Sequence, residues 1–89
     1  MDAKERENLR LLALSAISAA KGYAVEVQHI RPSLPPRLAR LPAEDIEAEL
    51  LYLEDKGFIE REKKEIAPVV KRWRITAAGR DYLAEEGME

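Results

Sequence analysis

The sequence predicts an α+β fold in which helices come first, a β-hairpin follows and a short helix closes the chain. Apolar residues recur at helical spacing through the first 20 residues and again around Leu50. Between Phe58 and Thr76 they alternate as in strands, and Thr76 itself is a typical N-cap. The chain has 89 residues, 46% of them hydrophobic and 36% charged, so residues 1–89 are expected to form a single domain with one modest core.

The first helix is expected to begin near Ala3, because Asp2 and Glu5 have the spacing of a capping box. Lys21 and Gly22 are expected to end it, since glycine supplies the left-handed residue that helix C-termini often need. Its apolar face is broad and comprises Leu9, Leu11, Leu12, Ala13, Leu14, Ala16, Ile17 and Ala20. So broad a face predicts that the helix lies at the centre of the fold or is shared with a partner subunit.

The next segment, residues 23–41, is less regular. Tyr23, Val25 and Val27 alternate like a strand, whereas Val27, Ile30 and Leu34 fit a helix. We interpret residues 23–33 as a short extended piece that leads into a turn, and the helical alternative stays open. Because prolines fit only turns or first helical turns, Ser33 is the expected N-cap of a short helix ending near Leu41.

The third helix is the best defined of the chain. Pro42 suits its first turn, Ile46, Leu50 and Leu53 recur on one face, and Gly57 is expected to end it. Two strands, Phe58–Ile66 and Val69–Thr76, are expected to pair around Ala67 and Pro68, with Trp73 in the core at the base of the hairpin. The last helix is then expected to follow Thr76.

Two motifs carry a family resemblance. Residues 50–60, LLYLEDKGFIE, resemble the third helix and first wing strand of winged helix-turn-helix proteins, and residues 74–83, RITAAGRDYL, resemble their second wing strand and closing helix. Within that superfamily the pattern is similar to regulators of the MarR and PadR type, and the small size is similar to winged-helix proteins of Mu-like prophages. The resemblance implies three helices, a two- or three-stranded wing sheet and a C-terminal helix.

The resemblance also implies a function. Such proteins usually bind double-stranded DNA as transcriptional regulators, with the third helix in the major groove and the wing on the neighbouring backbone. They usually act as dimers, and here a homodimer is expected to form through the first and last helices. The sequence therefore predicts a small DNA-binding protein.

Charge is distributed unevenly and argues against reading of bases by the third helix. The net charge is −2, yet residues 21–41 carry +3, residues 42–56 carry −5 and residues 58–74 carry +3. With Ile46, Leu50 and Leu53 inward, the flanking acids of the third helix are Asp45, Glu47, Glu49 and Glu54. A helix that reads bases needs Arg, Lys, Asn or Gln instead, and carboxylates repel phosphate.

The wing carries the opposite charge. A DNA contact led by the wing would be supported by the proline-rich segment, in which Arg31 is a further cation. The eight cations expected to contact DNA are Arg37, Arg40, Arg61, Lys63, Lys64, Lys71, Arg72 and Arg74. Alternatively, these are ordinary strand charges that pair across the hairpin with glutamates. In that case the protein is expected to bind another protein through the outward residues of the third helix: Glu44, Ala48, Leu51, Tyr52 and Asp55.

Other classes of function fit the sequence poorly. With no cysteine and one histidine, His29, neither a zinc site nor another metal site is expected, and no cofactor is implied. His29 has no evident nucleophile or orienting partner, so no catalytic residue and no enzyme activity are expected, and it is interpreted as partly packed. The start has no signal-peptide pattern and no stretch is long enough to span a membrane, so a cytoplasmic protein is expected.

Overall fold

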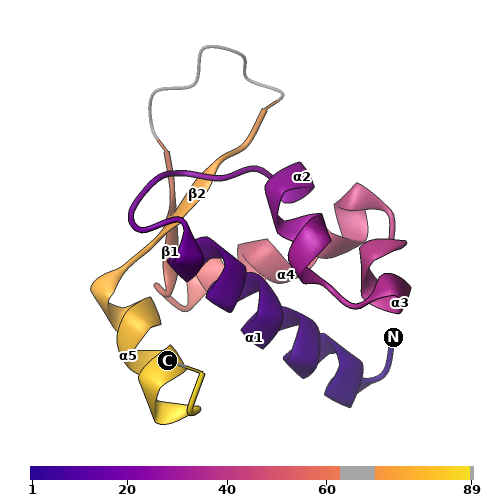
Figure 1. The fold of residues 1–89 in the computed structure, drawn as a ribbon, viewed down its shortest axis with the longest axis horizontal. Coiled ribbons are helices and arrows are strands. Elements are labelled where there is room, and N and C mark those ends of the chain that lie inside the picture. Colours follow the sequence, from indigo (N-terminus) through magenta and orange to yellow (C-terminus); the bar gives the residue numbers. More distant parts are fainter. Residues whose placement is uncertain (63–69, 89) are drawn as a thin grey trace.

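The computed structural model describes residues 1–62 and 70–88. Over these residues the chain is a small α+β protein with five α-helices, one 3₁₀ helix and a two-stranded antiparallel sheet. Figure 1 shows α1 crossing the molecule in front of α4, with the hairpin and α5 at one end and α2 and α3 at the other. The elements are α1 Ala3–Ala19, α2 Val27–Ile30, the 3₁₀ helix Arg31–Ser33, α3 Pro36–Ala39, α4 Ala43–Asp55, β1 Ile59–Arg61, β2 Trp73–Ile75 and α5 Ala77–Glu85.

Helix α1 is central. It packs against α4, β2, α5 and α2, and its buried side chains are Leu9, Ala13, Leu14 and Ile17. Asp2 caps it as expected, accepting a 2.8 Å hydrogen bond from the Glu5 N–H. After the helix, Lys21 and Gly22 adopt positive φ angles of 52° and 92°, so the predicted end of α1 is confirmed. The breadth of its apolar face is explained within a single chain, because α1 lies in the middle of the core.

The segment after α1 combines both predicted conformations. Val25 forms an isolated β-bridge with Trp73, in which each N–H donates to the other residue's carbonyl, at 2.8 and 2.9 Å. Helix α2 begins two residues later. The extended piece is therefore confirmed, but it is followed by a helical turn that the interpretation of residues 23–33 did not include.

The expectation that Ser33 caps a helix is wrong. Ser33 is the last residue of the 3₁₀ helix, and α3 begins at Pro36 with Pro35 in the N-cap position. Leu34 between them is extended and buried. The reason is that a residue before proline avoids the helical region, so the Leu34–Pro35–Pro36 sequence interrupts the helix.

The hairpin follows α4 closely. Gly57 has a φ of 80°, and the Phe58 N–H donates to the Leu53 carbonyl, which turns the chain out of α4 into β1. Ile59 pairs with Ile75 and Arg61 with Trp73. The paired strands are shorter than Phe58–Ile66 and Val69–Thr76, and the predicted turn at Ala67 and Pro68 lies outside the described residues.

The core forms between α1, α4, the sheet and the proline-rich segment. Trp73 is fully buried, which confirms its predicted place at the base of the hairpin. Thr76 caps α5 as predicted, since its Oγ1 accepts from the Gly79 N–H at 3.1 Å. None of the helices in the described part of the chain has the length and apolarity needed to cross a membrane.

Candidate interaction surface

The solvent side of α4 is the first candidate surface. Ile46, Leu50 and Leu53 are buried, which confirms the predicted inner face. The predicted outward residues, namely Glu44, Ala48, Leu51, Tyr52 and Asp55, are all exposed. Leu51 is 37% exposed and Tyr52 39%, so α4 presents two large hydrophobic side chains between its acidic ends.

Glu49 does not belong to this surface. It is only 8% exposed, and its Oε1 accepts a 2.8 Å hydrogen bond from Arg10 Nε of α1. The description of Glu49 as a flanking surface acid is therefore wrong. Its position on the helix turns it toward α1, where a cation 39 residues away in sequence compensates its burial.

Tyr52 is partly covered by cations. The Arg10 guanidinium lies 3.7 Å from the centroid of its ring and the Lys56 ammonium 5.7 Å. These groups border a pocket of about 380 Å³ between α1, α4 and α5. A cation over a ring face is attracted by its negative potential, so Tyr52 is held in place rather than free to reorient.

The other wall of that pocket is aromatic. The rings of Phe58 and Tyr82 stack with centroids 4.5 Å apart and an angle of 11° between their planes. Burial raises the pKa of the Tyr82 phenol, and the negative charges of Glu86 and Glu7 raise it further. Tyr82 therefore stays protonated over a wider alkaline range than a free tyrosine.

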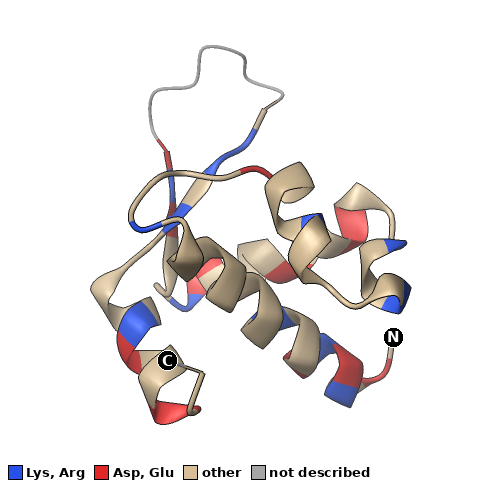
Figure 2. Ribbon diagram, viewed as in Figure 1, with Lys and Arg blue, Asp and Glu red and all other residues tan. Residues whose placement is uncertain are grey.

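Two cations of the hairpin, Lys71 and Arg61, face carboxylates of α4. Lys71 Nζ pairs with Glu47, and Arg61 Nε lies 3.2 Å from Glu54 Oε1. Glu54 also accepts a 2.9 Å hydrogen bond from the indole Nε1 of Trp73. Figure 2 shows the basic positions of the strands beside acidic positions of α4. Two carboxylates of α4 thus neutralise two cations of the hairpin within one chain.

The other two cations of the described hairpin residues, Arg72 and Arg74, are paired as well. Arg74 Nη2 lies 3.2 Å from Glu62, and Arg72 Nε lies 3.3 Å from Glu26. Pairing across the hairpin, the alternative expected for these charges, accounts for the contacts with Glu62. The other pairs leave the hairpin: Lys71 and Arg72 meet glutamates 24 and 46 positions away, and Arg61 meets Glu54, seven positions before it. Lys63 and Lys64, which were also expected to contact DNA, lie outside the described residues.

A second candidate surface lies at α3. Arg31 is half-buried, and its Nη1 donates to the carbonyls of Ala39 at 2.6 Å and Leu41 at 2.8 Å, so it fixes the turn between α3 and α4. The Arg37 side chain is 82% exposed and makes one 3.3 Å contact with Glu5. Arg40 is exposed and has no ion pair with another described residue. These two arginines are the least neutralised of the predicted DNA contacts in the described part of the chain.

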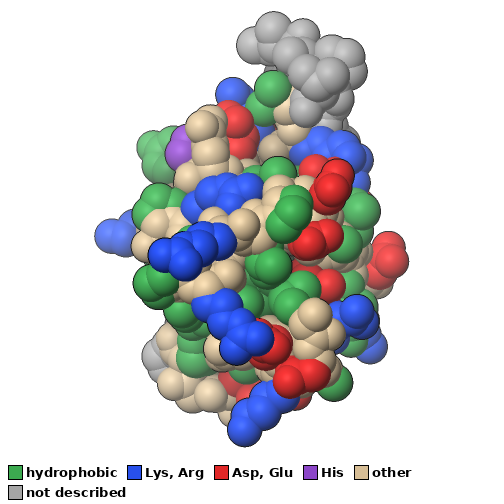
Figure 3. All heavy atoms as spheres, turned by 90° about the vertical axis from the view of Figure 1, so that its right-hand side faces the viewer, with side chains coloured by type: hydrophobic (Ala, Val, Ile, Leu, Met, Phe, Trp, Pro, Cys, Tyr) green, Lys and Arg blue, Asp and Glu red, His purple; other side chains and the backbone are tan. Residues whose placement is uncertain are grey.

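This end of the molecule is bipolar. Figure 3 shows a row of Lys and Arg side chains along one side of its middle, a row of Asp and Glu side chains along the other, and hydrophobic side chains between the rows; further Lys and Arg side chains flank the acidic row. Arg37 and Arg40 belong to the α3 side, and Glu44 and Asp45 to the first turn of α4. Opposite charges therefore lie side by side on one face, with only the turn between the two helices separating them.

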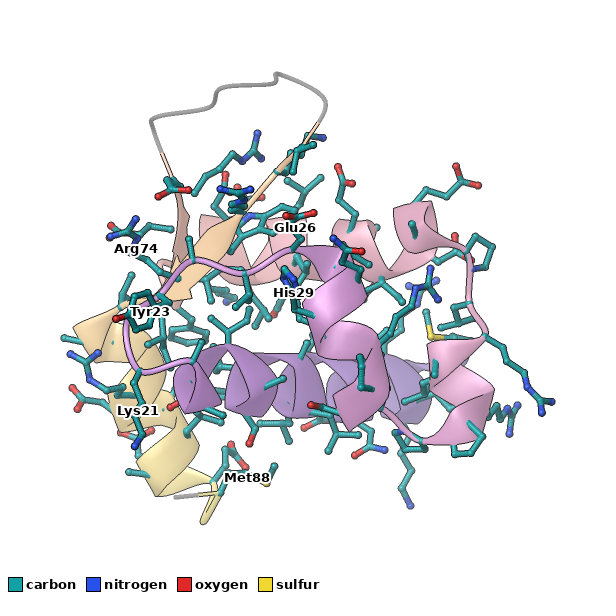
Figure 4. The ribbon with its side chains drawn as sticks, turned by 45° about the horizontal axis from the view of Figure 1, so that its top comes forward. Lys21, Tyr23, Glu26, His29, Arg74 and Met88 are labelled. Carbon is teal, nitrogen blue, oxygen red and sulfur yellow. The ribbon has the colours of Figure 1, made fainter. Side chains whose placement is uncertain are left out.

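The remaining polar and aromatic groups point elsewhere. His29 is exposed rather than partly packed, and its Nδ1 accepts from the Glu26 N–H at 3.1 Å, which caps α2. Tyr23 is 79% exposed on the loop after α1, at the opposite end from α3 (Figure 4). No group of three or more His, Cys, Asp or Glu side chains among residues 1–62 and 70–88 is arranged to hold a metal ion.

Comparison with known proteins gives a likeness in fold. No protein-family model matches this chain, and no curated protein matches it. Among solved structures it is similar to AF1382 from Archaeoglobus fulgidus, with a TM-score of 0.61 and 16% sequence identity. The superposition covers 98% of this chain and 85% of AF1382, so the likeness extends over the whole described fold.

Proposed function

We propose that this chain is a winged-helix domain that binds another protein through the solvent side of α4 instead of reading DNA with it. In this assignment α4 is the third helix of the motif, β1 and β2 are the wing strands, and the bridge at Val25 is the remnant of a third strand. The fold hosts both DNA-binding and protein-binding uses, so the choice rests on the surface.

The observation that carries the proposal is the pairing between α4 and the wing. Glu47 and Glu54 hold Lys71 and Arg61, the cations that a wing would offer to phosphate. A DNA backbone approaching this side would have to compete with those carboxylates and would meet Glu44 and Asp55 on the exposed stripe. Both effects oppose binding of a polyanion.

The solvent side of α4 has the features of a surface that binds another protein. Ala48 and Leu51 form the exposed apolar middle of the stripe, with carboxylates at its two ends. Small apolar centres with charged rims are common in protein interfaces, where the centre excludes water and the rim selects the partner. Arg10 and Lys56 hold Tyr52 at the edge of this stripe, which lowers the entropy lost on binding.

Site-specific cross-linking tests the proposal. A photoreactive phenylalanine derivative in place of Ala48 should cross-link to protein in cells, whereas the same group in place of Ala84, exposed on α5, should give a different and weaker set of products. Adding Leu51→Asp to the chain that carries the photoreactive residue at position 48 should abolish these cross-linked products. Cross-links to DNA at position 48, or protein products unchanged by Leu51→Asp, would overturn the proposal.

A second candidate function has one observation in its favour. Arg37 and Arg40 are exposed, Arg37 makes one 3.3 Å contact with Glu5, and Arg40 has no ion pair with another described residue, so both guanidinium groups are open to a phosphate. Backbone binding to DNA through these two residues would show as an affinity that falls steeply with salt. Anisotropy titration of a labelled duplex with wild type and Arg37→Ala/Arg40→Ala tests it, and equal curves would remove it.

A further inference from the structure

The bipolar face at α3 and α4 identifies a partner for the α4 surface, and the inference rests on the proposed function. We propose that the partner is a second copy of this chain, related by a two-fold axis through the turn at Leu41–Ala43. In that arrangement Arg37 and Arg40 of one copy face Glu44 and Asp45 of the other, twice over. The hydrophobic side chains between the two charged strips form the centre (Figure 3).

Charge complementarity selects this occupant. A polyanion is attracted by the α3 strip, Arg37 and Arg40, and repelled by the α4 strip, Glu44 and Asp45. A uniformly basic protein is attracted by the α4 strip and repelled by the α3 strip. The surface that complements adjacent positive and negative strips is the same surface turned by 180°. A two-fold interface has this property by construction, because each contact occurs twice.

The two strips are held rigidly with respect to each other. Arg31 donates to the carbonyls of Ala39 and Leu41, at the end of α3 and in the turn that follows. The buried side chains of Leu38 and Ile46 anchor α3 and the first turns of α4 to the core. Little reorganisation is therefore needed for the two strips to meet their counterparts.

The apolar part of the face is exposed in a single chain. Pro36, Pro42, Ala43 and Ala48 are all exposed, and Leu51 continues the stripe along α4. Arg40 pairs with no other described residue and the exposed Arg37 makes one 3.3 Å contact with Glu5, whereas Lys71 and Arg61 are paired with α4. The face offers both its charges and its apolar centre to a partner.

The prediction differs from a dimer through the first and last helices. Within one chain, the apolar face of α1 is already largely covered, because Leu9, Ala13, Leu14 and Ile17 lie in the core and Leu12 and Ala16 pack against it. Substitutions on α5 therefore serve as matched controls. Lys21 also lies at the end of the molecule away from α3 (Figure 4).

Charge exchange tests the interface. Sedimentation equilibrium of the full chain should show a dimer that weakens with salt. Arg37→Glu/Arg40→Glu should weaken it by at least about tenfold, and so should Glu44→Arg/Asp45→Arg, because like charges then face each other. Mixing these two variants in equal amounts should restore a dimer containing one chain of each, since one now presents only acids and the other only bases.

Two further variants control for net charge and folding. Lys21→Glu/Arg80→Glu and Asp81→Arg/Glu85→Arg carry the same net charges as the test pair, and each should dimerise like the wild type. Circular dichroism should show unchanged helix content in all four. A monomeric wild type at about millimolar concentration, a dimer unaffected by the α3 and α4 reversals, or a dimer lost in the α5 controls would overturn the inference.

These outcomes are separable from a failure of the proposed function. If the wild type is monomeric but position 48 still cross-links to a different protein, the second copy is excluded and protein binding by α4 is retained. If no protein cross-links at position 48 and DNA does, the proposed function fails together with the dimer.

Discussion

Arg10 of α1 and Glu49 of α4 form a half-buried ion pair, with 2.8 Å between Arg10 Nε and Glu49 Oε1. The Arg10 and Glu49 side chains are 27% and 11% exposed, so Glu49 has little access to water. The same guanidinium covers the ring of Tyr52. One side chain thus joins the central helix to α4 and positions the edge of the proposed interaction surface.

Replacing Arg10 should therefore destabilise the fold. Arg10→Met leaves the Glu49 carboxylate buried without its partner, and urea unfolding should show a loss of about 2–3 kcal/mol. Arg10→Met/Glu49→Leu should recover most of that loss. Arg6→Met, an exposed change on the same helix, should alter stability by less than about 0.5 kcal/mol. An Arg10→Met protein as stable as the wild type would show that the Arg10–Glu49 pair contributes nothing to the free energy of unfolding.

The N-cap of α5 gives a second prediction. Thr76 Oγ1 accepts from the Gly79 N–H and donates to the Gly57 carbonyl at 2.6 Å, so it joins α5 to the end of α4. Thr76→Ala should cost about 1–2 kcal/mol in chemical denaturation, because both hydrogen bonds are lost. Thr76→Ser retains the hydroxyl and should cost much less; equal losses would assign the effect to the methyl group.

Gly79 is required for close packing, not for an unusual backbone angle. A Cβ at this position would overlap the Phe58 carbonyl oxygen and lie 2.9 Å from Ile75 Cγ1. Gly79→Ala should therefore lower stability by about 3 kcal/mol despite the better helix propensity of alanine. Ala78→Ser, exposed on the neighbouring position, should change the unfolding midpoint little. A stabilised Gly79→Ala protein would contradict this account of the α5 contact.

The pairing of α4 with Lys71 and Arg61 predicts a gain of DNA binding when the α4 carboxylates are removed. Glu47→Gln/Glu54→Gln releases Lys71 and Arg61, while the new amide oxygen at position 54 can still accept from the Trp73 indole. Affinity for a labelled duplex at low salt should rise by about tenfold. Glu44→Gln/Asp55→Asn removes the same charge from α4 but leaves Lys71 and Arg61 paired with Glu47 and Glu54. The DNA affinity of this control should therefore rise less. Equal gains would attribute the effect to net charge alone.

The free energy of unfolding at alkaline pH should depend on the phenol of Tyr82. Burial, and then the charges of Glu86 and Glu7, raise its pKa above the unfolded value of 10.0. Between the two pKa values the folded state therefore keeps the phenol proton while the unfolded chain releases it. The contribution of this proton to the free energy of unfolding is complete below pH 10 and is lost as pH rises through the folded pKa. Tyr82→Phe should reduce the fall in unfolding free energy between about pH 8 and about pH 11. Tyr23→Phe, on an exposed side chain, should leave the fall unchanged.

Local signals predicted much of the fold. The caps at Asp2 and Thr76, the end of α1 at Lys21 and Gly22, and the inner face of α4 all depend on residues a few positions apart, and all are confirmed. The short helix expected to follow Ser33 and end near Leu41 is present only as α3, Pro36–Ala39, because the prolines at positions 32, 35, 36 and 42 divide the backbone into short pieces. Such pieces are stabilised by tertiary contacts such as those of Arg31, which no local pattern contains.

The candidate surface was less predictable than the fold. Helical spacing placed Ala48, Leu51 and Asp55 on the outside of α4, but spacing alone cannot say which flanking acid meets a cation. Glu49 is joined to Arg10 across 39 residues, and Lys71 to Glu47 across 24. Pairings of this length depend on how helices and strands pack together.

By itself, the sequence determined α1, α4, the hairpin and α5 and the segregation of its charges, because propensity, capping and periodicity act over one or two turns. Only the tertiary structure decided what those charges do. It paired Lys71 of the hairpin with the acidic helix, buried one carboxylate against α1 and placed Arg37 and Arg40 beside Glu44 and Asp45. The physical reason is that an ion pair requires two groups within a few ångströms, a distance that chain folding sets and sequence separation does not.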